Sequence, residues 1–150
     1  MNWFNYIGLT IIIIILIPNF FYMIKNKNSN VDLYKNKCIE FFEQVGIYSF
    51  FLLMIFNIPY AYYGLWFDNA LLVYIVVNSV LVFLYVLIWI LFWNKHLIFR
   101  AYALSIIPSI IFVFSSIILA SYPLIAVSVI FAYCHIFISL KNAYITVKNK

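Results

Sequence analysis

The amino-acid sequence alternates between five long apolar stretches and short polar segments. A helix needs about 20 predominantly apolar residues to cross the hydrocarbon core of a bilayer, and each stretch is close to that length. The pattern predicts an all-α integral membrane protein. We expect one membrane domain over residues 1–150, a bundle of five transmembrane helices over residues 3–24, 39–60, 70–93, 101–120 and 124–140.

The composition supports a membrane protein. Hydrophobic residues make up 68% of the 150 residues and charged residues 9%, whereas about a quarter of the residues of a soluble domain are charged. Five spans occupy most of the chain, so no separate soluble domain is expected. Any function therefore resides inside the bundle or at its two rims.

The basic residues predict the orientation. All nine lie in three segments, Lys25 to Lys37, Lys95 to Arg100 and Lys141 to Lys150, and the N-terminus and the intervening connections carry none. Basic residues favour the cytoplasmic side of a membrane, so we expect the N-terminus outside and the C-terminus inside. The start, Met1-Asn2-Trp3, lacks the basic region of a signal peptide. The strong charge bias also means that any homo-oligomer should be parallel.

Local features refine the spans. Trp89 and Trp93 are suited to the headgroup boundary on the cytoplasmic side. The opposite, outer boundary suits the aromatic residues of the second connection, which are Tyr60, Tyr62, Tyr63, Trp66 and Phe67. Pro123 suits the first turn of a helix, since its missing N–H has no intrahelical partner there. The short Ser121-Tyr122-Pro123 turn predicts that the last two helices are antiparallel neighbours.

Polar residues inside spans are costly, so their positions are informative. Asn19 and His135 each precede a lysine by six residues, and Glu43 follows Lys37 by six. At 1.5 Å per residue these side chains lie at a similar depth in the cytoplasmic leaflet. His135 and Ser139 also share one stripe of their helix. We therefore expect a cytoplasm-facing ligand-binding site built from Asn19, Glu43, Gln44, Arg100, His135 and Ser139.

Each of these residues also has a structural interpretation. Glu43 could sit in the headgroup zone beside Lys37, and Arg100 could extend to lipid phosphate. His135 could be a neutral bundle histidine bonded to a serine or a backbone carbonyl. The asparagines, Asn19 among them, could join helices by hydrogen bonds.

The sequence carries no motif for catalysis or for a cofactor. Paired histidines at metal-binding spacing and a glycine-rich phosphate loop are absent from it, so no enzyme, cofactor or metal is expected. A Glu43–His135 acid–base pair would rest on depth alone. Cys38 and Cys134 should stay reduced near the cytoplasmic side, without a structural disulfide. Membrane orientation explains the net charge of +5, so no nucleic-acid partner is expected.

Two classes of function remain. The first is a protein that binds or transports a small polar solute, with the site coupled to a proton. The second is a non-enzymatic interaction protein, such as an immunity or accessory subunit that acts through a membrane partner protein. In either class the basic rim faces the anionic inner leaflet of the bilayer. Polar groups that converge on a cavity favour the first class, and polar groups on the outside of the bundle favour the second.

Four segments resemble those of an uncharacterised family of small polytopic membrane proteins from low-GC Gram-positive, clostridia-like bacteria. They are residues 38–46 (CIEFFEQVG), 56–59 (FNIP), 104–109 (LSIIPS) and 135–142 (HIFISLKN). The resemblance covers most of the chain and implies a multi-pass protein of the bacterial plasma membrane, without a known activity. In that group an arginine follows the glutamate–glutamine pair, where this chain has Ile47 and Tyr48.

Overall fold

The computed structural model describes residues 3–148 apart from 26–35, 59–60, 62 and 94–97. This part of the chain forms five helices and one isolated antiparallel bridge, between Phe4 and Phe56. The helices are α1 (Tyr6–Lys25), α2 (Lys37–Ile55), α3 (Ala70–Leu91), α4 (Ile98–Ile118) and α5 (Tyr122–Lys148).

All five helices are long and apolar enough to cross a membrane, which confirms the predicted all-α class and indicates a multi-pass membrane protein. Most boundaries lie within three residues of the prediction, and two differ by more. α2 ends at Ile55 rather than near residue 60, because Phe56 is extended and pairs with Phe4. α5 continues to Lys148, because neither glycine nor proline follows Leu140 to end the helix where the apolar stretch ends.

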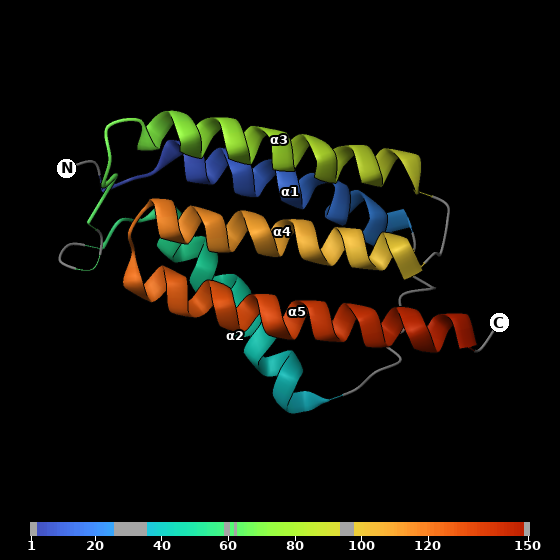
Figure 1. The fold of residues 1–150 in the computed structure, drawn as a ribbon. Coiled ribbons are helices and arrows are strands. Elements are labelled where there is room, and N and C mark those ends of the chain that lie inside the picture. The colour runs from blue at the N-terminus through green and yellow to red at the C-terminus, as the bar shows by residue number, and fades with distance from the viewer. Residues whose placement is uncertain (1–2, 26–35, 59–60, 62, 94–97, 149–150) are drawn as a thin grey trace.

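The helices form a ring in the order α1, α2, α5, α4, α3, in which α3 contacts α1 again. α4 and α5 make the most extensive contact and run antiparallel, as predicted (Figure 1). α2 lies oblique to the others, and the two ends of the chain lie at opposite ends of the bundle. α1 and α3 end, and α2 and α4 begin, at the same end of the bundle, which we call the basic end. We call the opposite end the aromatic end.

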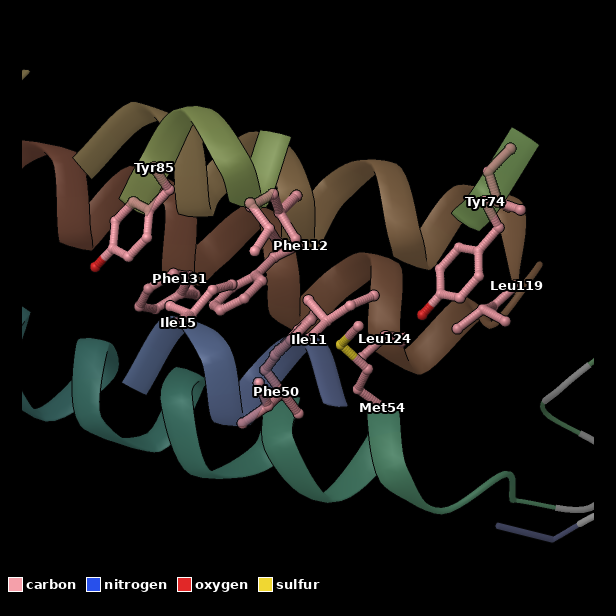
Figure 2. Packing of buried hydrophobic residues seen from close by; sticks show 14 of the residues in the cluster. Ile11, Ile15, Phe50, Met54, Tyr74, Tyr85, Phe112, Leu119, Leu124 and Phe131 are labelled. Carbon is pink, nitrogen blue, oxygen red and sulfur yellow. The ribbon is translucent and has the colours of Figure 1, made fainter. Parts of the chain in front are cut away.

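Apolar side chains fill the centre of this ring (Figure 2). The Phe50 ring of α2 stacks on Phe112 of α4 at 3.9 Å between centroids, and Phe112 lies 5.2 Å from Phe131 of α5. Three helices are thus joined through one line of aromatic rings. Isoleucines of α1 and Met54 of α2 pack beside this line.

Buried polar side chains join the helices on the α4 side. Asn78 of α3 accepts a hydrogen bond from the Ser115 hydroxyl of α4 at 3.2 Å, and the hydroxyls of Ser116 and Ser128 lie 3.1 Å apart between α4 and α5. These four residues are at most 1% exposed. Buried polar groups need such partners, so the bonds set the relative positions of α3, α4 and α5.

At the aromatic end, α1 and α2 approach closely. The Asn5 and Asn57 N–H groups donate to the carbonyls of Ile55 and Trp3, at 2.8 and 2.9 Å. A Cβ atom at Gly8 would lie only 2.6 Å from the Met54 carbonyl oxygen. Glycine is therefore required at position 8 for the two backbones to pack at this distance.

We expect Gly8→Ala to separate α1 from α2 and to lower the free energy of unfolding by about 1 to 3 kcal/mol. Thermal unfolding in detergent measures this effect. Val80→Ile is the control, since it adds one carbon atom at a position of α3 that is 54% exposed. Equal melting temperatures for Gly8→Ala and the parent would contradict the close packing.

Candidate functional site

The start of α2 fixes the position of Glu43. Asn36 caps the helix, its side-chain oxygen accepting from the backbone N–H groups of Cys38 and Ile39 at 3.2 and 3.5 Å. The Glu40 carboxylate in turn accepts from the Asn36 N–H at 3.2 Å. This reciprocal arrangement resembles a capping box and engages Glu40 in the cap. Glu43 lies about one turn further along the helix.

Close packing of α2 on α5 brings Glu43 to His135. A Cβ atom at Gly46 would lie 3.1 Å from the Phe131 Cβ atom, so the absence of a side chain at position 46 lets the helices approach. Glu43 and His135 lie about one helical turn from this contact, Glu43 on α2 and His135 on α5. The Glu43 Oε1 and His135 Nδ1 atoms are 2.7 Å apart.

The pair lies between the core and the surface. The side chains of His135 and Glu43 are 25% and 17% exposed. The imidazole stacks on the Phe131 ring, with 4.9 Å between centroids and 19° between the planes. Since Phe131 belongs to the aromatic line of the core, the orientation of the imidazole depends on the central packing.

The geometry defines the chemistry available to the pair. A carboxylate at this distance accepts a hydrogen bond from an Nδ1–H group, and a protonated carboxyl group donates one to a bare Nδ1. The same contact can therefore form in more than one protonation state of the pair. The pair can take up or release a proton while it stays hydrogen-bonded.

Arg100 does not join this pair through the contacts that the structure defines for it. The residue is 7% exposed, and its guanidinium carbon lies 4.3 Å from the ring centroid of Tyr22 and 4.8 Å from that of Trp89. Its Nη1 donates to the Trp93 carbonyl at 3.2 Å. Arg100 thus folds inward against α1 and α3 instead of extending to the rim, while Glu43 and His135 belong to α2 and α5.

The other three predicted site residues also separate. Asn19 is exposed on α1, its amide donates to the Ile15 carbonyl at 3.1 Å, and it lies near the Tyr85 hydroxyl. Gln44 is exposed on α2, and Ser139 is half-buried one turn beyond His135. The predicted site is therefore divided between a Glu43–His135 pair, flanked by Ser139, and an Arg100 cluster with Asn19 nearby.

Helix directions explain why the contacts described above do not join the six predicted residues in one cluster. α1 and α2 contact each other at the aromatic end, and α2 lies oblique to the bundle (Figure 1). The sequence gives the depth of a residue along its helix. It does not give the tilt of that helix, which decides the neighbours that the residue contacts. The aromatic partners of Arg100 were also not predicted. Trp89 and Trp93 were expected in a belt at the membrane interface, but Trp89 is only 4% exposed.

A groove of about 250 Å³ lies elsewhere, between α1 and α3. Its lining is mainly apolar and includes none of the predicted binding residues: Ile7, Thr10, Ile11, Ile14, Ile75, Asn78, Ser79 and Val82. Among the residues that the structure describes, no three histidine, cysteine or acidic side chains are grouped so that they could hold a metal ion.

The sequence matches no protein-family model, and no curated protein or solved structure is significantly similar to the chain. The resemblance to membrane proteins of low-GC bacteria therefore stays a prediction. The fold defines a class of protein, namely a helical protein whose described residues form five helices able to cross a membrane. A partly buried acid–base pair joins two of these helices.

We expect the Glu43–His135 contact to be measurable as a coupling energy. In a double-mutant cycle with Glu43→Gln and His135→Ala, the two effects on the free energy of unfolding should fail to add by about 1 kcal/mol. The control cycle pairs His135→Ala with Glu40→Gln, whose carboxylate is engaged at the helix cap, and should be additive. Additivity in both cycles would show that the contact contributes nothing to stability.

Proposed function

We propose that the protein binds a small polar solute at the Glu43–His135 pair and transports it. The observation that carries the proposal is the 2.7 Å contact between Glu43 Oε1 and His135 Nδ1 across two apolar helices. Ionisable side chains are expensive within membrane-spanning segments and usually mark ligand or proton pathways. A purely structural α2–α5 contact would not need them, since α2 already packs closely on Phe131 of α5 at Gly46.

Access from the basic end supports a binding role. Glu43 follows Lys37 by six residues and His135 precedes Lys141 by six, which is about 9 Å along a helix. Both side chains keep part of their surface exposed. A solute entering at the basic end would meet a carboxylate, an imidazole and, one turn further, the Ser139 hydroxyl.

The pair also provides a route for proton coupling. A solute that hydrogen-bonds to Glu43 competes with His135 for the carboxylate, and this competition favours a different protonation state of the pair. Solute binding would then be linked to proton uptake or release, so pH would alter the affinity. The chemistry is binding and proton exchange, without a covalent step.

The basic end faces the cytoplasm in this proposal, and the membrane is the plasma membrane of a bacterium. All nine lysine and arginine residues lie in or beside the α1–α2 and α3–α4 connections or in the last ten residues of the chain, the distribution expected of the cytoplasmic side. The N-terminus is then outside and the C-terminus inside. Solute from the cytoplasm would reach the pair directly.

The alternative function is that of an interaction protein, and the exposure of Gln44 favours it. This polar side chain lies on the outside of α2 next to Phe41, Val45 and Tyr48, which are 61%, 43% and 68% exposed. A polar group within an apolar outer face gains from hydrogen-bonding to a neighbouring helix. The partner would be another membrane protein or, in a parallel homo-oligomer, a second copy of the chain.

A ligand screen tests the proposed site. Thermal unfolding of the purified protein is measured with sugars, amino acids, nucleobases and vitamins; a ligand at 100 times its dissociation constant stabilises by about 2.7 kcal/mol. We expect Glu43→Gln and His135→Ala to abolish stabilisation by the correct solute, and Glu40→Gln to retain it. A solute that stabilises all variants equally binds elsewhere. Stabilisation by a membrane protein partner alone, lost in Gln44→Leu, would favour the interaction protein.

The orientation is tested with cysteine labelling. In a chain carrying Cys38→Ser and Cys134→Ser, we expect Asn69→Cys at the aromatic end to react with an impermeant thiol reagent added to whole cells. Lys148→Cys at the basic end should react only after the cells are opened. The reverse pattern would place the Glu43–His135 pair on the outer side and contradict entry from the cytoplasm.

A further inference from the structure

The composition of α2 does not match its exposure. Of the five helices that the structure describes, α2 has the smallest share of buried residues and is also the least apolar. Lipid tails form no hydrogen bonds, so the helix that exposes most of its surface to lipid should instead be the most apolar. Part of the exposed surface of α2 therefore fits a protein partner better than it fits lipid.

Gln44 is the polar side chain of α2 that lacks a partner within the chain. Glu40 is engaged at the helix cap, and Glu43 is bonded to His135. The Gln44 side chain is exposed and makes no hydrogen bond with the part of the chain that the structure describes. It follows Lys37 by seven residues, about 10 Å along the helix. Within a bilayer, an amide at this depth is costly unless another protein group bonds to it.

The residues around Gln44 form one continuous outer face of α2. Phe41, Val45, Tyr48 and Leu52 are 61%, 43%, 68% and 60% exposed. Steps of three and four residues relate them, which is the spacing by which two helices pack along a left-handed seam. The buried residues of α2 lie on the other side of the helix. We call these five residues, Phe41, Gln44, Val45, Tyr48 and Leu52, the α2 seam.

We propose that the α2 seam pairs with the same seam of a second copy of the chain, in a parallel twofold dimer. Identical residues face each other across the axis of such a pair, so the two Gln44 side chains meet. An amide carries both donors and an acceptor, and two amides can therefore satisfy each other. This self-complementarity favours a second copy over an unrelated membrane protein.

Two further features fit a parallel dimer. The biased distribution of the nine basic residues leads every copy to insert in the same direction, as parallel pairing requires. A single polar residue within an apolar seam also fixes the register of the two helices. The dimer does not depend on the proposed solute function, since Gln44 is not part of the Glu43–His135 pair.

Sedimentation equilibrium of the full chain in neutral detergent, at several ratios of protein to detergent, tests the dimer. We expect the parent to dimerise reversibly, Gln44→Leu to weaken association by about tenfold, and Gln44→Asn, which keeps the amide, to retain most of it. Leucine is a good helix former and suits lipid, so Gln44→Leu should leave the monomer folded. Ser79→Leu, at an exposed polar position of α3, is the control and should associate like the parent.

Disulfide cross-linking in membranes locates the interface. In a chain carrying Cys38→Ser and Cys134→Ser, we expect Phe41→Cys to form a covalent dimer on oxidation, because the two copies of position 41 lie together at the seam. Ile90→Cys is the matched control near the basic end of α3. Its position is 69% exposed, and it should stay monomeric.

The outcomes are distinct. A parent that stays monomeric at every ratio overturns the dimer, and so does parental association in Gln44→Leu. Cross-linking at position 90 without cross-linking at position 41 would place the contact on another helix and contradict the seam. Glu43→Gln should associate like the parent, so the dimer stands or falls independently of the solute site.

Discussion

A polar group buried among apolar helices has to find its partner within the protein, because hydrocarbon offers no hydrogen bonds in its place. This constraint governs each interior polar contact of the bundle. Asn78 and Ser115 satisfy it between α3 and α4, and Ser116 and Ser128 between α4 and α5. These two hydrogen-bonded pairs and the aromatic stack set the positions of the central helices. The ionisable side chains Glu43, His135 and Arg100 lie closer to the basic end.

α2 is attached to the bundle through two glycine contacts. Gly8 of α1 admits the Met54 carbonyl near one end of α2, and Gly46 lets α2 approach Phe131 of α5. The Glu43–His135 contact is a consequence of the second approach, because a larger residue at position 46 would push the helices apart. The distance between Glu43 and His135 therefore depends on how closely α2 packs on α5.

The sequence predicted the helices and the antiparallel arrangement of α4 and α5, but not how the helices tilt and rotate against one another. Apolar length alone located the five helices, since a bilayer imposes a minimum span. It misplaced the end of α5, because hydropathy falls after Leu140 while the helix continues to Lys148. The depth argument placed Glu43 and His135 at one level, and the structure pairs them. The same argument failed for Arg100, whose partners Tyr22 and Trp89 depend on the rotation and tilt of α1 and α3.

The Arg100 contacts and the Glu43–His135 pair involve different helices, and α4 packs against both α3 and α5. Arg100 lies in the first turn of α4 over the Tyr22 and Trp89 rings. Phe112, further along this helix, packs against Phe131, on which His135 stacks. Cores of this density do not deform continuously, so a displacement of α4 at one cluster requires repacking at the other. We expect any coupling between the two clusters to pass through α4 and this aromatic line, which a double-mutant cycle between them would measure.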